Sequence, residues 1–378
     1  MERVPLLVIG AGPYGVSIAA RALERGIDTV VVGRFMGFWT DHMPRGMFLR
    51  SGTDWHLDAS GIHTFEAFTE ETALSSASID PVPIDVFLDY ASWFQAQKHV
   101  VVRDRLVHRL RHDGTFIASL DDGTEIAADS VVAAPGVQYF PQAPDWAATV
   151  PDKISTHTCD LARFEEFAGT RVLVVGGRQS AYEWAALLCE SGVEQVDIVH
   201  RHDVPRFARV SWRFVDEYID ATIGTPGWWR SLTPVEQEKI ARKFWEAGRL
   251  TLEWWLTPRL EDSRLRRRPR TQVVEASVVH PDTVTVALSS GEALTVDRVV
   301  FATGYSADVS CVPYLGDLIG SLAIADGYPL LDNAFQSSVT GLYFPGFAAT
   351  RDFGPFFGFT KACPAAATLI VDDLLRQR

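Results

Sequence analysis

The pattern of apolar and polar residues along the chain predicts a strand–turn–helix–strand unit that occurs twice. Residues 5–33 begin with an apolar run, pass through the glycine turn GAGPYG, continue as an amphipathic helix and end in a second apolar run. Residues 170–201 repeat this order around the turn GGRQSA. Gly26 and Gly192 stand where glycine ends a helix. Each unit therefore predicts two parallel strands joined by a helix.

A second pair of segments extends the repeat. Residues 105–136 predict strands around an Asp-Gly turn and then a buried strand, and residues 272–304 predict the same arrangement around a Ser-Gly turn. From the first glycine of each turn to the glycine that ends each segment, the intervals are 126 and 128 residues. Two copies of one nucleotide-binding plan explain these intervals. We therefore predict an α/β fold with two Rossmann-like dinucleotide-binding domains, each with a parallel sheet.

The connecting segments predict how the two domains are joined. The stretches at 135–151 and after Gly304 are typical of crossings between domains, so the second domain is expected to be inserted into the first. We predict the first domain over residues 1–150, the second over 151–303, and a return to the first over 304–378 that ends in a helix from about Cys363 to Arg376.

Residues 203–270 do not fit the repeat and predict a tryptophan-rich helical insert in the second domain. The sequence Thr-Pro-Val-Glu at 233–236 is a capping box with proline at the first helical position, so a helix is expected to begin there. The tryptophans of the insert are typical either of core packing or of a substrate-access lid or dimer contact. The arginine run at 264–270 is expected to be a solvated turn or, alternatively, a phosphate contact.

Composition excludes several classes of protein. The chain has 378 residues, of which 47% are hydrophobic, and this suits two globular domains. The net charge of −13 argues against nucleic acid or an anionic membrane as the main partner. The four cysteines form no CxxC pair, so neither a metal site nor a dithiol centre is predicted. The sequence contains neither an apolar run of about 18 residues nor a leader pattern, so we expect the protein in the cytoplasm.

The first glycine turn has the residues of a dinucleotide site, since it follows an apolar strand and opens a helix. Gly10 permits the tight turn, Gly12 lets the backbone approach a pyrophosphate, and Gly15 lets helix and strand pack closely. The acid that usually binds the adenosine ribose is missing, because Gly33 and Arg34 end the second strand. Arg34 is expected to pack over the adenine or to reach a phosphate. An arginine there is compatible with NADP, but the two-domain layout favours FAD.

The second turn departs from the usual pattern at its middle position. Gly176 and the small Ala181 are present, but Arg178 stands where a glycine would let the backbone touch the pyrophosphate. The arginine is expected either to occlude the site or to bind phosphate oxygens through its guanidinium. The following strand ends at His200 and Arg201, with no acid for a ribose 2′-hydroxyl, so NADPH is favoured over NADH.

These motifs resemble those of the flavoproteins with two dinucleotide-binding domains and, within them, the class B flavoprotein monooxygenases. That group includes flavin-containing, N-hydroxylating and Baeyer–Villiger monooxygenases. The resemblance rests on both glycine turns, on the segment GFW at 37–39, similar to the family's GG-x-W, and on the ATG element at 302–304. It implies FAD at the first turn and NADPH at the second. The residues expected to contact the cofactors are Gly10, Gly12, Pro13, Tyr14, Gly15, Arg34, Trp39, Gly136, Gly176, Arg178, Gln179, Ser180, Ala181, Arg201, Thr303, Gly304, Gly346 and Phe347.

The resemblance also implies where the reaction takes place. Residues 37–58 are expected to pass beside the isoalloxazine ring, with Arg50, Asp54 and His56 as candidate catalytic residues. In such enzymes NADPH reduces FAD, O₂ adds at C4a and the peroxyflavin gives one oxygen atom to a substrate. Arg50 would stabilise the peroxyflavin; alternatively, Arg50 and Asp54 pair only to hold the loop. The phenylalanine-rich segment 351–360 is expected to form the opposite wall or to pack in the core.

The leading interpretation is an NADPH-dependent monooxygenase. It would act on a small molecule at nitrogen, sulfur or a carbonyl-adjacent carbon, with O₂ as co-substrate. A homodimer is a possible oligomeric state. Two alternatives remain: a flavin reductase or oxidase without oxygen insertion, and a non-catalytic flavin-binding sensor. Disulfide-reducing relatives need a CxxC pair, whose absence disfavours that branch.

Overall fold

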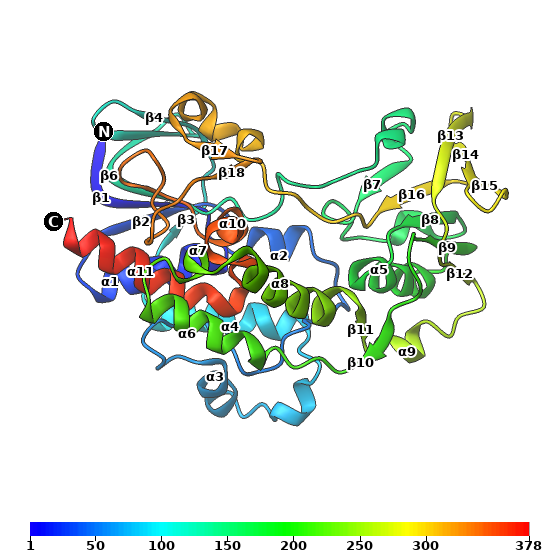
Figure 1. The fold of residues 1–378 in the computed structure, drawn as a ribbon, viewed down its shortest axis with the longest axis horizontal. Helices are drawn as coiled ribbons and strands as arrows, with labels where there is room; N and C mark the ends of the chain where they lie inside the picture. The colour runs from blue at the N-terminus through cyan, green and yellow to red at the C-terminus, as the bar shows by residue number, and fades with distance from the viewer. Residues whose placement is uncertain (378) are drawn as a thin grey trace.

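The computed structural model describes residues 1–377, which form two α/β lobes (Figure 1). Each lobe contains its own sheet with parallel strands at its centre. The first strand, β1, and the last helix, α11, both lie in the first lobe (Figure 1). The predicted α/β class with two Rossmann-like units is confirmed.

The sheet of the first lobe runs in the order β3-β2-β1-β6-β5-β4, and β19 pairs with the end of β6. β1 lies between β2 and β6 and is parallel to both, and its residues Leu6, Leu7 and Val8 are fully buried. Burial on both faces explains its continuous apolar run. The strands are β1 (Glu2–Ile9), β2 (Thr29–Val32), β3 (Val102–Arg103), β4 (Val107–His112), β5 (Phe116–Leu120), β6 (Glu125–Ala133) and β19 (Leu342–Tyr343).

Helices from both ends of the sequence cover this sheet. Helix α11 packs against α1 and begins and ends where the sequence predicted a terminal helix. A small hairpin, β17 (Ile324–Ala325) with β18 (Tyr328–Pro329), lies in the returning segment. The helices of the lobe are α1 (Pro13–Glu24), α2 (Gly37–Asp41), α3 (Phe65–Glu71), α4 (Ile84–Gln97), α10 (Thr350–Phe353) and α11 (Cys363–Arg376).

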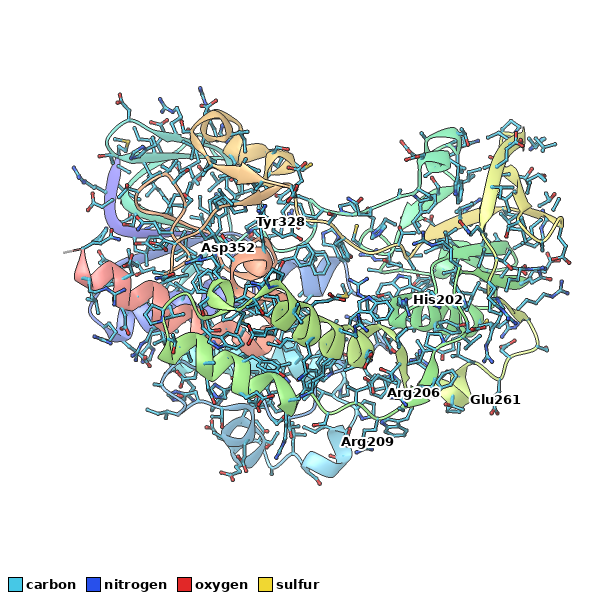
Figure 2. The ribbon with its side chains drawn as sticks, viewed as in Figure 1. His202, Arg206, Arg209, Glu261, Tyr328 and Asp352 are labelled. Carbon is cyan, nitrogen blue, oxygen red and sulfur yellow. The ribbon has the colours of Figure 1, made fainter. Side chains whose placement is uncertain are left out.

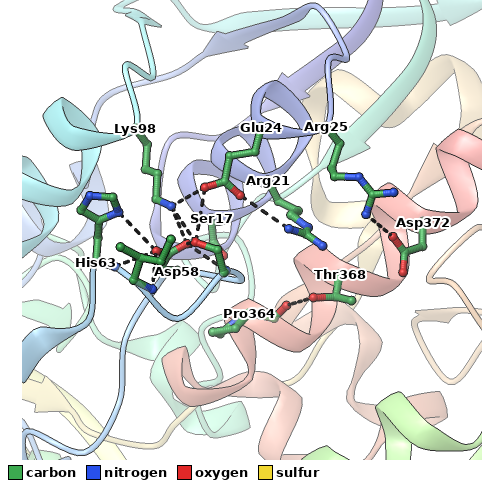
Figure 3. A network of polar contacts seen from close by, with 12 residues as sticks. Ser17, Arg21, Glu24, Arg25, Asp58, His63, Lys98, Pro364, Thr368 and Asp372 are labelled. Atoms are coloured by element: carbon green, nitrogen blue, oxygen red, sulfur yellow. Dashed lines mark hydrogen bonds and ion pairs between the residues drawn. The ribbon is translucent and has the colours of Figure 1, made fainter.

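A buried ionic cluster joins three segments of the first lobe (Figure 3). The Asp58 carboxylate accepts hydrogen bonds from the backbone nitrogens of Ser60, Ile62 and His63 at 3.0, 3.1 and 2.7 Å. Lys98, at the end of α4, lies 2.7 Å from Asp58 and also pairs with Glu24 of α1. The loop after residue 57 is thereby fixed between the ends of two helices.

The sheet of the second lobe is parallel throughout, in the order β12-β9-β8-β16-β7. Helix α5 (Gln179–Glu190) connects β8 to β9, and an antiparallel sheet of β13, β14 and β15 lies beside it. The strands are β7 (Ser155–His157), β8 (Arg171–Val175), β9 (Gln195–Val199), β12 (Leu265–Arg268), β13 (Val273–His280), β14 (Thr283–Leu288), β15 (Ala293–Val296) and β16 (Arg298–Phe301).

The arginine run at 264–270 is not the solvated turn that the sequence suggested. Residues Leu265–Arg268 form edge strand β12, and Arg268 donates to the buried carboxylate of Asp197 at 2.6 Å. The guanidinium of Arg268 pairs with a carboxylate that would otherwise be buried without a cation.

The insert extends from the second lobe to the first. Helix α6 packs against α11, and α7 packs against α10. Arg209, after β10, lies 2.7 Å from Asp80, while Arg230 of α7 lies 4.0 Å from Asp352 of α10. Figure 2 labels Arg209 and Asp352. Its elements are β10 (Arg206–Ala208), α6 (Asp216–Gly224), α7 (Trp228–Ser231), α8 (Pro234–Arg249), β11 (Thr251–Glu253) and α9 (Leu256–Arg259).

Helix α8 begins at Pro234 with the capping box of Thr233 and Glu236, as predicted. It runs from α7, beside the first lobe, toward β11 and α5 in the second (Figure 1). The side chains of Trp212 and Trp229 are buried in the core of the first lobe, whereas that of Trp255 is buried in the second. Core packing thus accounts for part of the tryptophan content of the insert.

The two segments that connect the lobes run side by side. Pro141 and Tyr305 form an antiparallel bridge, and the Gln142 nitrogen donates to the Gly304 carbonyl at 2.9 Å. Domain boundaries at residues 150 and 303 remain a prediction. No helix within residues 1–377 is long and apolar enough to cross a membrane.

Candidate functional site

Both glycine turns are shaped by the carbonyl oxygen of a neighbouring strand. Gly10 follows β1 with a φ of +109°, and a Cβ there would lie 2.3 Å from the Ala134 oxygen. Gly176 follows β8 with a φ of +139°, and a Cβ there would lie 2.3 Å from the Ala302 oxygen. Only glycine fits at either position. The two turns therefore share the same close contact between their first glycine and the carbonyl oxygen of a neighbouring strand.

The first turn leaves space at its second glycine. Gly12 is the N-cap of α1, Pro13 follows it, and a Cβ on Gly12 would meet no atom of residues 1–377 within 4 Å. Gly15 is enclosed instead, because a Cβ there would lie 1.8 Å from the Gly10 oxygen. No side chain caps α1, so the N–H groups of its first turn remain available to an anion. This geometry fits the pyrophosphate of a dinucleotide.

Gly33 explains why the usual ribose-binding acid is missing from the first site. Its φ is +140°, and a Cβ there would lie 3.0 Å from the Ala11 nitrogen, so a side chain would crowd the turn itself. Arg34 lies beside it at the surface, with Nη1 3.1 Å from Oδ2 of Asp41. A contact of Arg34 with an adenine or a phosphate remains a prediction.

Tyr14 joins the first turn to the C-terminal segment. A Cβ on Gly346, whose φ is +77°, would lie 3.2 Å from the Tyr14 ring. The Tyr14 hydroxyl donates to the carbonyls of Phe357 and Phe359. Burial raises the pKa of Tyr14, so the hydroxyl remains a donor. Tyr14 and Gly346, with Phe347 next to it, are thus brought to one place.

The other predicted cofactor residues lie at the ends of strands and in a short helix. Trp39 of α2 packs against Phe87, with ring centroids 4.5 Å apart. Gly136 follows β6 and Gly304 follows β16, with φ values of +69° and +84°. The Thr303 hydroxyl donates to the backbone of the opposite connecting segment. The contacts of these residues with cofactors remain predictions.

At the second turn, the backbone is packed closely against the end of β9. A Cβ on Gly177 would lie 2.3 Å from the His200 ring, so this glycine is required by a neighbouring side chain. The side chains of Gln179 and Ala181 are buried in the first turn of α5, whereas Ser180 is exposed. Burial lowers the pKa of His200 to about 4, and the nearby His202 adds to this effect. His200 is therefore neutral at pH 7.

Arg178 turns toward the insert. Its Nη1 donates to the carbonyl of Arg249, and its Cζ lies 4.9 Å from the Trp245 ring centroid. Burial lowers the pKa of Arg178, and the charges of Arg249 and Arg201 lower it further. The sequence pattern did not identify Trp245 or Arg249, since the insert returns to the turn 71 residues after Arg178.

A buried network that the sequence did not predict connects α5 to the insert. Glu183 accepts from Gln179 Nε2 and from the Phe48 nitrogen, both at 3.1 Å, while Gln179 Oε1 accepts from the Glu253 nitrogen at 3.0 Å. Burial raises the pKa of both carboxyls. The sequence signal that could have revealed this network is Glu183, a charged residue within the apolar pattern of α5.

Arg50 is bound to the insert. Its Nε donates to Glu253 Oε1 at 3.0 Å, and its Nη2 lies 3.3 Å from the carbonyls of Ala247 and Thr251. The alternative that Arg50 pairs with Asp54 is wrong, because the buried Glu253 carboxylate takes this cation. A catalytic role for Arg50 remains a prediction.

Asp54 and His56 lie near Lys361. Oδ2 of Asp54 is 3.1 Å from Nζ of Lys361 and 3.4 Å from Nε of Arg213, and Lys361 is also 3.0 Å from Asp216. Nδ1 of His56 is buried, and the Asp58 backbone lies within reach of the imidazole. Burial lowers the pKa of His56, so the imidazole is neutral at pH 7. The roles of both residues remain predictions.

The sequence left open whether the phenylalanines of segment 351–360 pack in the core or form a wall of the site, and the structure shows both buried and exposed members. Phe353, Phe356 and Phe357 are buried in the first core, whereas Phe359 is 48% exposed. The Phe359 ring lies 5.8 Å from the ring of Trp212 in the insert. Among these phenylalanines, only Phe359 is exposed enough to line an open wall.

Comparison with known proteins finds both reductases and monooxygenases. The chain is 28% identical over 215 residues to a ferredoxin–NADP reductase from Nocardioides sp., covering 53% of this chain and 55% of that protein. It is 26% identical over 349 residues to the monooxygenase aurF from Gibberella zeae, covering 82% and 64%. The matched region thus spans about half of the first of these curated relatives.

The fold has a close counterpart among solved structures. The ornithine N-hydroxylase from Kutzneria sp. 744 superposes with a TM-score of 0.82 at 17% sequence identity, over 99% of each chain. Residues 7–214, which contain both glycine turns, match the family described as pyridine nucleotide-disulphide oxidoreductase. Because this match covers more than half of its length, the chain belongs to the pyridine nucleotide-disulphide oxidoreductase family.

Proposed function

We propose that the protein is an FAD- and NADPH-dependent monooxygenase that inserts one oxygen atom from O₂ into a small molecule. The observation that carries the proposal is the pair of matched glycine turns, one in each lobe, each enclosed by a strand carbonyl and each opening a helix. Two dinucleotide sites in one chain are what electron transfer from a nicotinamide to a flavin requires.

The surroundings of the two turns favour one assignment of the cofactors. We place FAD at the first turn, where Gly12 leaves space for a pyrophosphate and Tyr14 contacts the returning segment at Gly346 and Phe359. We place NADPH at the second, where Arg178 and Arg201 provide guanidinium groups.

The chain's own residues would bind and orient the reactants. FAD, when bound, would supply the redox chemistry that couples NADPH oxidation to O₂. In the balanced reaction NADPH, a proton, O₂ and the substrate give NADP⁺, water and the oxygenated substrate, whether nitrogen, sulfur or a carbon–carbon bond is attacked. His56 is a candidate proton acceptor, because burial lowers its pKa and keeps the imidazole neutral at pH 7. Asp54 and Lys361 would hold the polar part of the substrate beside Phe359.

A flavin reductase without oxygen insertion is the second candidate, and the match to the ferredoxin–NADP reductase supports it. Three of the four thiols disfavour disulfide reduction, and the fourth, Cys311, is exposed but has no second cysteine at CxxC spacing. Cys159, Cys189 and Cys363 are buried, and burial raises the pKa of Cys159 to about 12 and that of Cys189 to about 11. Such thiols are poor nucleophiles at pH 7.

The deciding experiment mixes the purified protein with NADPH without oxygen and follows the visible absorbance of the flavin. Bleaching by NADPH excludes the non-catalytic sensor. Isotopically labelled O₂ is then admitted with candidate amines, sulfides and ketones. Label in a product establishes the monooxygenase, whereas NADPH oxidation that yields only hydrogen peroxide or a reduced acceptor establishes the reductase or oxidase.

A further inference from the structure

The end of helix α8 is held by one arginine from each lobe. None of the residues of α8 is buried, so burial does little to fix the helix in place. From the first lobe, Arg50 donates to the carbonyls of Ala247 and Gly248. From the second lobe, Arg178 donates to the carbonyl of Arg249. Carbonyls in the last turn of a helix lack partners within the helix, so these two guanidiniums fix its end.

The two arginines are bound with different strength. Nε of Arg50 lies 3.0 Å from the buried carboxylate of Glu253, so this cation stays where it is. Arg178 is bound to α8 through one neutral carbonyl, that of Arg249, and through the ring of Trp245, whose centroid lies 4.9 Å from its Cζ. We call these two contacts of Arg178 the latch. An anion that competes for the guanidinium would open the latch and leave Arg50 in place.

Arg178 stands where the second dinucleotide is expected to bring such an anion. It is the N-cap residue of α5, and no side chain caps this helix, so the N–H groups of the first turn are available to a phosphate. A hydrogen bond from a guanidinium to a phosphate oxygen is about twice as strong as one between neutral groups. A phosphate at this turn and the Arg249 carbonyl therefore compete for the same side chain.

The same end of α8 packs against aromatic rings that belong to the other side of the molecule. The ring of Phe244 lies 5.1 Å from that of Phe359 and 5.4 Å from that of Trp212. A Cβ on Gly248 would lie 3.1 Å from the Trp212 ring, so helix and indole are in close contact. Phe359 is the exposed phenylalanine proposed as a wall of the substrate site. A shift at the end of α8 would therefore be felt at this wall.

We propose that nucleotide binding at the second turn opens the Arg178 latch and frees the end of α8, which couples this turn to the substrate wall at Phe359. The guanidinium leaves Trp245 and the Arg249 carbonyl and pairs with a phosphate of the nucleotide, while Arg50 keeps α8 attached to the first lobe. This inference rests on the proposed function and concerns its regulation. Because coupling between two equilibria is reciprocal, a weaker latch gives tighter nucleotide binding.

Calorimetric titration with NADP⁺ tests this reciprocity without a reaction. Trp245→Leu weakens the latch, so it should bind NADP⁺ about two- to fivefold more tightly than wild type, the scale of an exposed cation–π contact. The matched control is Trp254→Leu, because Trp254 is another exposed tryptophan of the insert, with the Cζ of Arg209 5.0 Å from its ring centroid. This control should bind NADP⁺ as the wild type does.

Amide hydrogen exchange measures the opening of the latch directly. In the wild type, saturating NADP⁺ should speed the exchange of the amides in the last turn of α8 about fivefold, the scale of one lost hydrogen bond. In Arg178→Ala these amides should exchange fast without nucleotide, and NADP⁺ should add little.

Two results would overturn the proposal and leave the proposed function standing. One is Trp245→Leu that binds NADP⁺ as tightly as the wild type or less tightly, as expected of a ring that only packs or touches the nucleotide. The other is exchange at the end of α8 that stays the same or slows when NADP⁺ is bound. A wild type that binds no NADP⁺ would refute the proposed function, and the latch with it.

Discussion

Gly12 and Gly15 belong to the same turn, yet a side chain would meet different surroundings at each. Gly12 has an extended backbone, with φ of −80° and ψ of −174°, and space around its Cβ position. Gly12→Val should therefore fold, with a free energy of unfolding within about 1 kcal/mol of wild type, but fill the space assigned to the pyrophosphate. We expect colourless protein, measured as flavin absorbance per polypeptide.

Two further glycine variants control this experiment. Gly15→Ala should fail to fold, because its Cβ would lie 1.8 Å from a backbone oxygen. Gly316→Val, at an exposed position with space around the Cβ, should keep full flavin content. Full flavin occupancy in Gly12→Val would contradict the placement of FAD.

Arg50→Ala should destabilise the protein by about 3–5 kcal/mol, because it leaves the buried Glu253 carboxylate without its cation. Burial raises the pKa of Glu253 and Arg50 opposes that effect, so the folded-state pKa of the variant rises further. A raised folded pKa means that stability falls as pH rises above the ordinary value of 4.5. The loss should therefore be smaller in acid than at neutral pH, as measured by denaturant unfolding.

The double variant Arg50→Ala/Glu253→Gln separates charge from packing. It should recover part of the lost stability and remove most of the pH dependence. If Arg50 also acts on the reacting oxygen, Arg50→Ala should release more hydrogen peroxide for each NADPH oxidised. Unchanged coupling would leave it a structural residue only.

At the scale of whole elements, the Asp58–Lys98 cluster decides how the loop after residue 57 sits between α1 and α4. Burial alone would raise the pKa of Asp58, but hydrogen bonds from His63, Lys98 and Ser60 lower it well below its usual range. Asp58→Asn should cost about 3–5 kcal/mol at pH 7, since it leaves the Lys98 ammonium buried with a weaker partner.

The stability lost in Asp58→Asn, like that lost in Arg50→Ala, should depend on pH, although here the folded-state pKa of the wild-type carboxyl is lowered rather than raised. A lowered folded pKa provides stability above the unfolded value of about 3.9, and that stability is lost as pH falls. The difference between wild type and Asp58→Asn should therefore shrink in acid. Asp372→Asn removes the exposed pair with Arg25 seen in Figure 3 and should cost less than about 1 kcal/mol. Equal losses in both variants would refute the importance of burial.

Elements defined by short stretches of sequence could be predicted, and those defined by distant contacts could not. The two glycine turns, the start of α8 at Pro234 and the terminal helix all depend on residues within one or two helical turns. The strand at 265–268 was missed because an arginine run is typical of a solvated surface, and its partner Asp197 lies 71 residues away. The partner of Arg50, 203 residues away, left no local signal.

At the scale of the whole molecule, the insert makes the two lobes interdependent. It is anchored to the first lobe by Trp229 and Arg230 and to the second by Trp255, while α8 contacts both. The sequence indicated that the tryptophans of the insert would be buried, but not in which of the two cores. The periodicity of apolar residues shows which face of an element is buried, not which element it packs against.

This connection predicts one cooperative unfolding transition that responds to nucleotide as a unit. NADP⁺ at a hundred times its dissociation constant should raise the free energy of unfolding by about 2.7 kcal/mol. The transition should shift equally when followed by flavin release, which reports the first lobe, and by far-ultraviolet circular dichroism. A flavin signal that stays in place while the other shifts would mean that the lobes unfold independently.

The pairing of β19 with β6 has a consequence for the order of events during synthesis. Tyr343 lies beside Val132, so the first sheet combines residues that leave the ribosome more than two hundred positions apart. The second sheet needs only residues 155–301, all of which emerge earlier than β19. During synthesis, the second lobe therefore has all the strands of its sheet before the first lobe does. The first lobe lacks β19 and helix α11 until the end of synthesis, so chaperone binding should be concentrated on nascent chains shorter than about 340 residues.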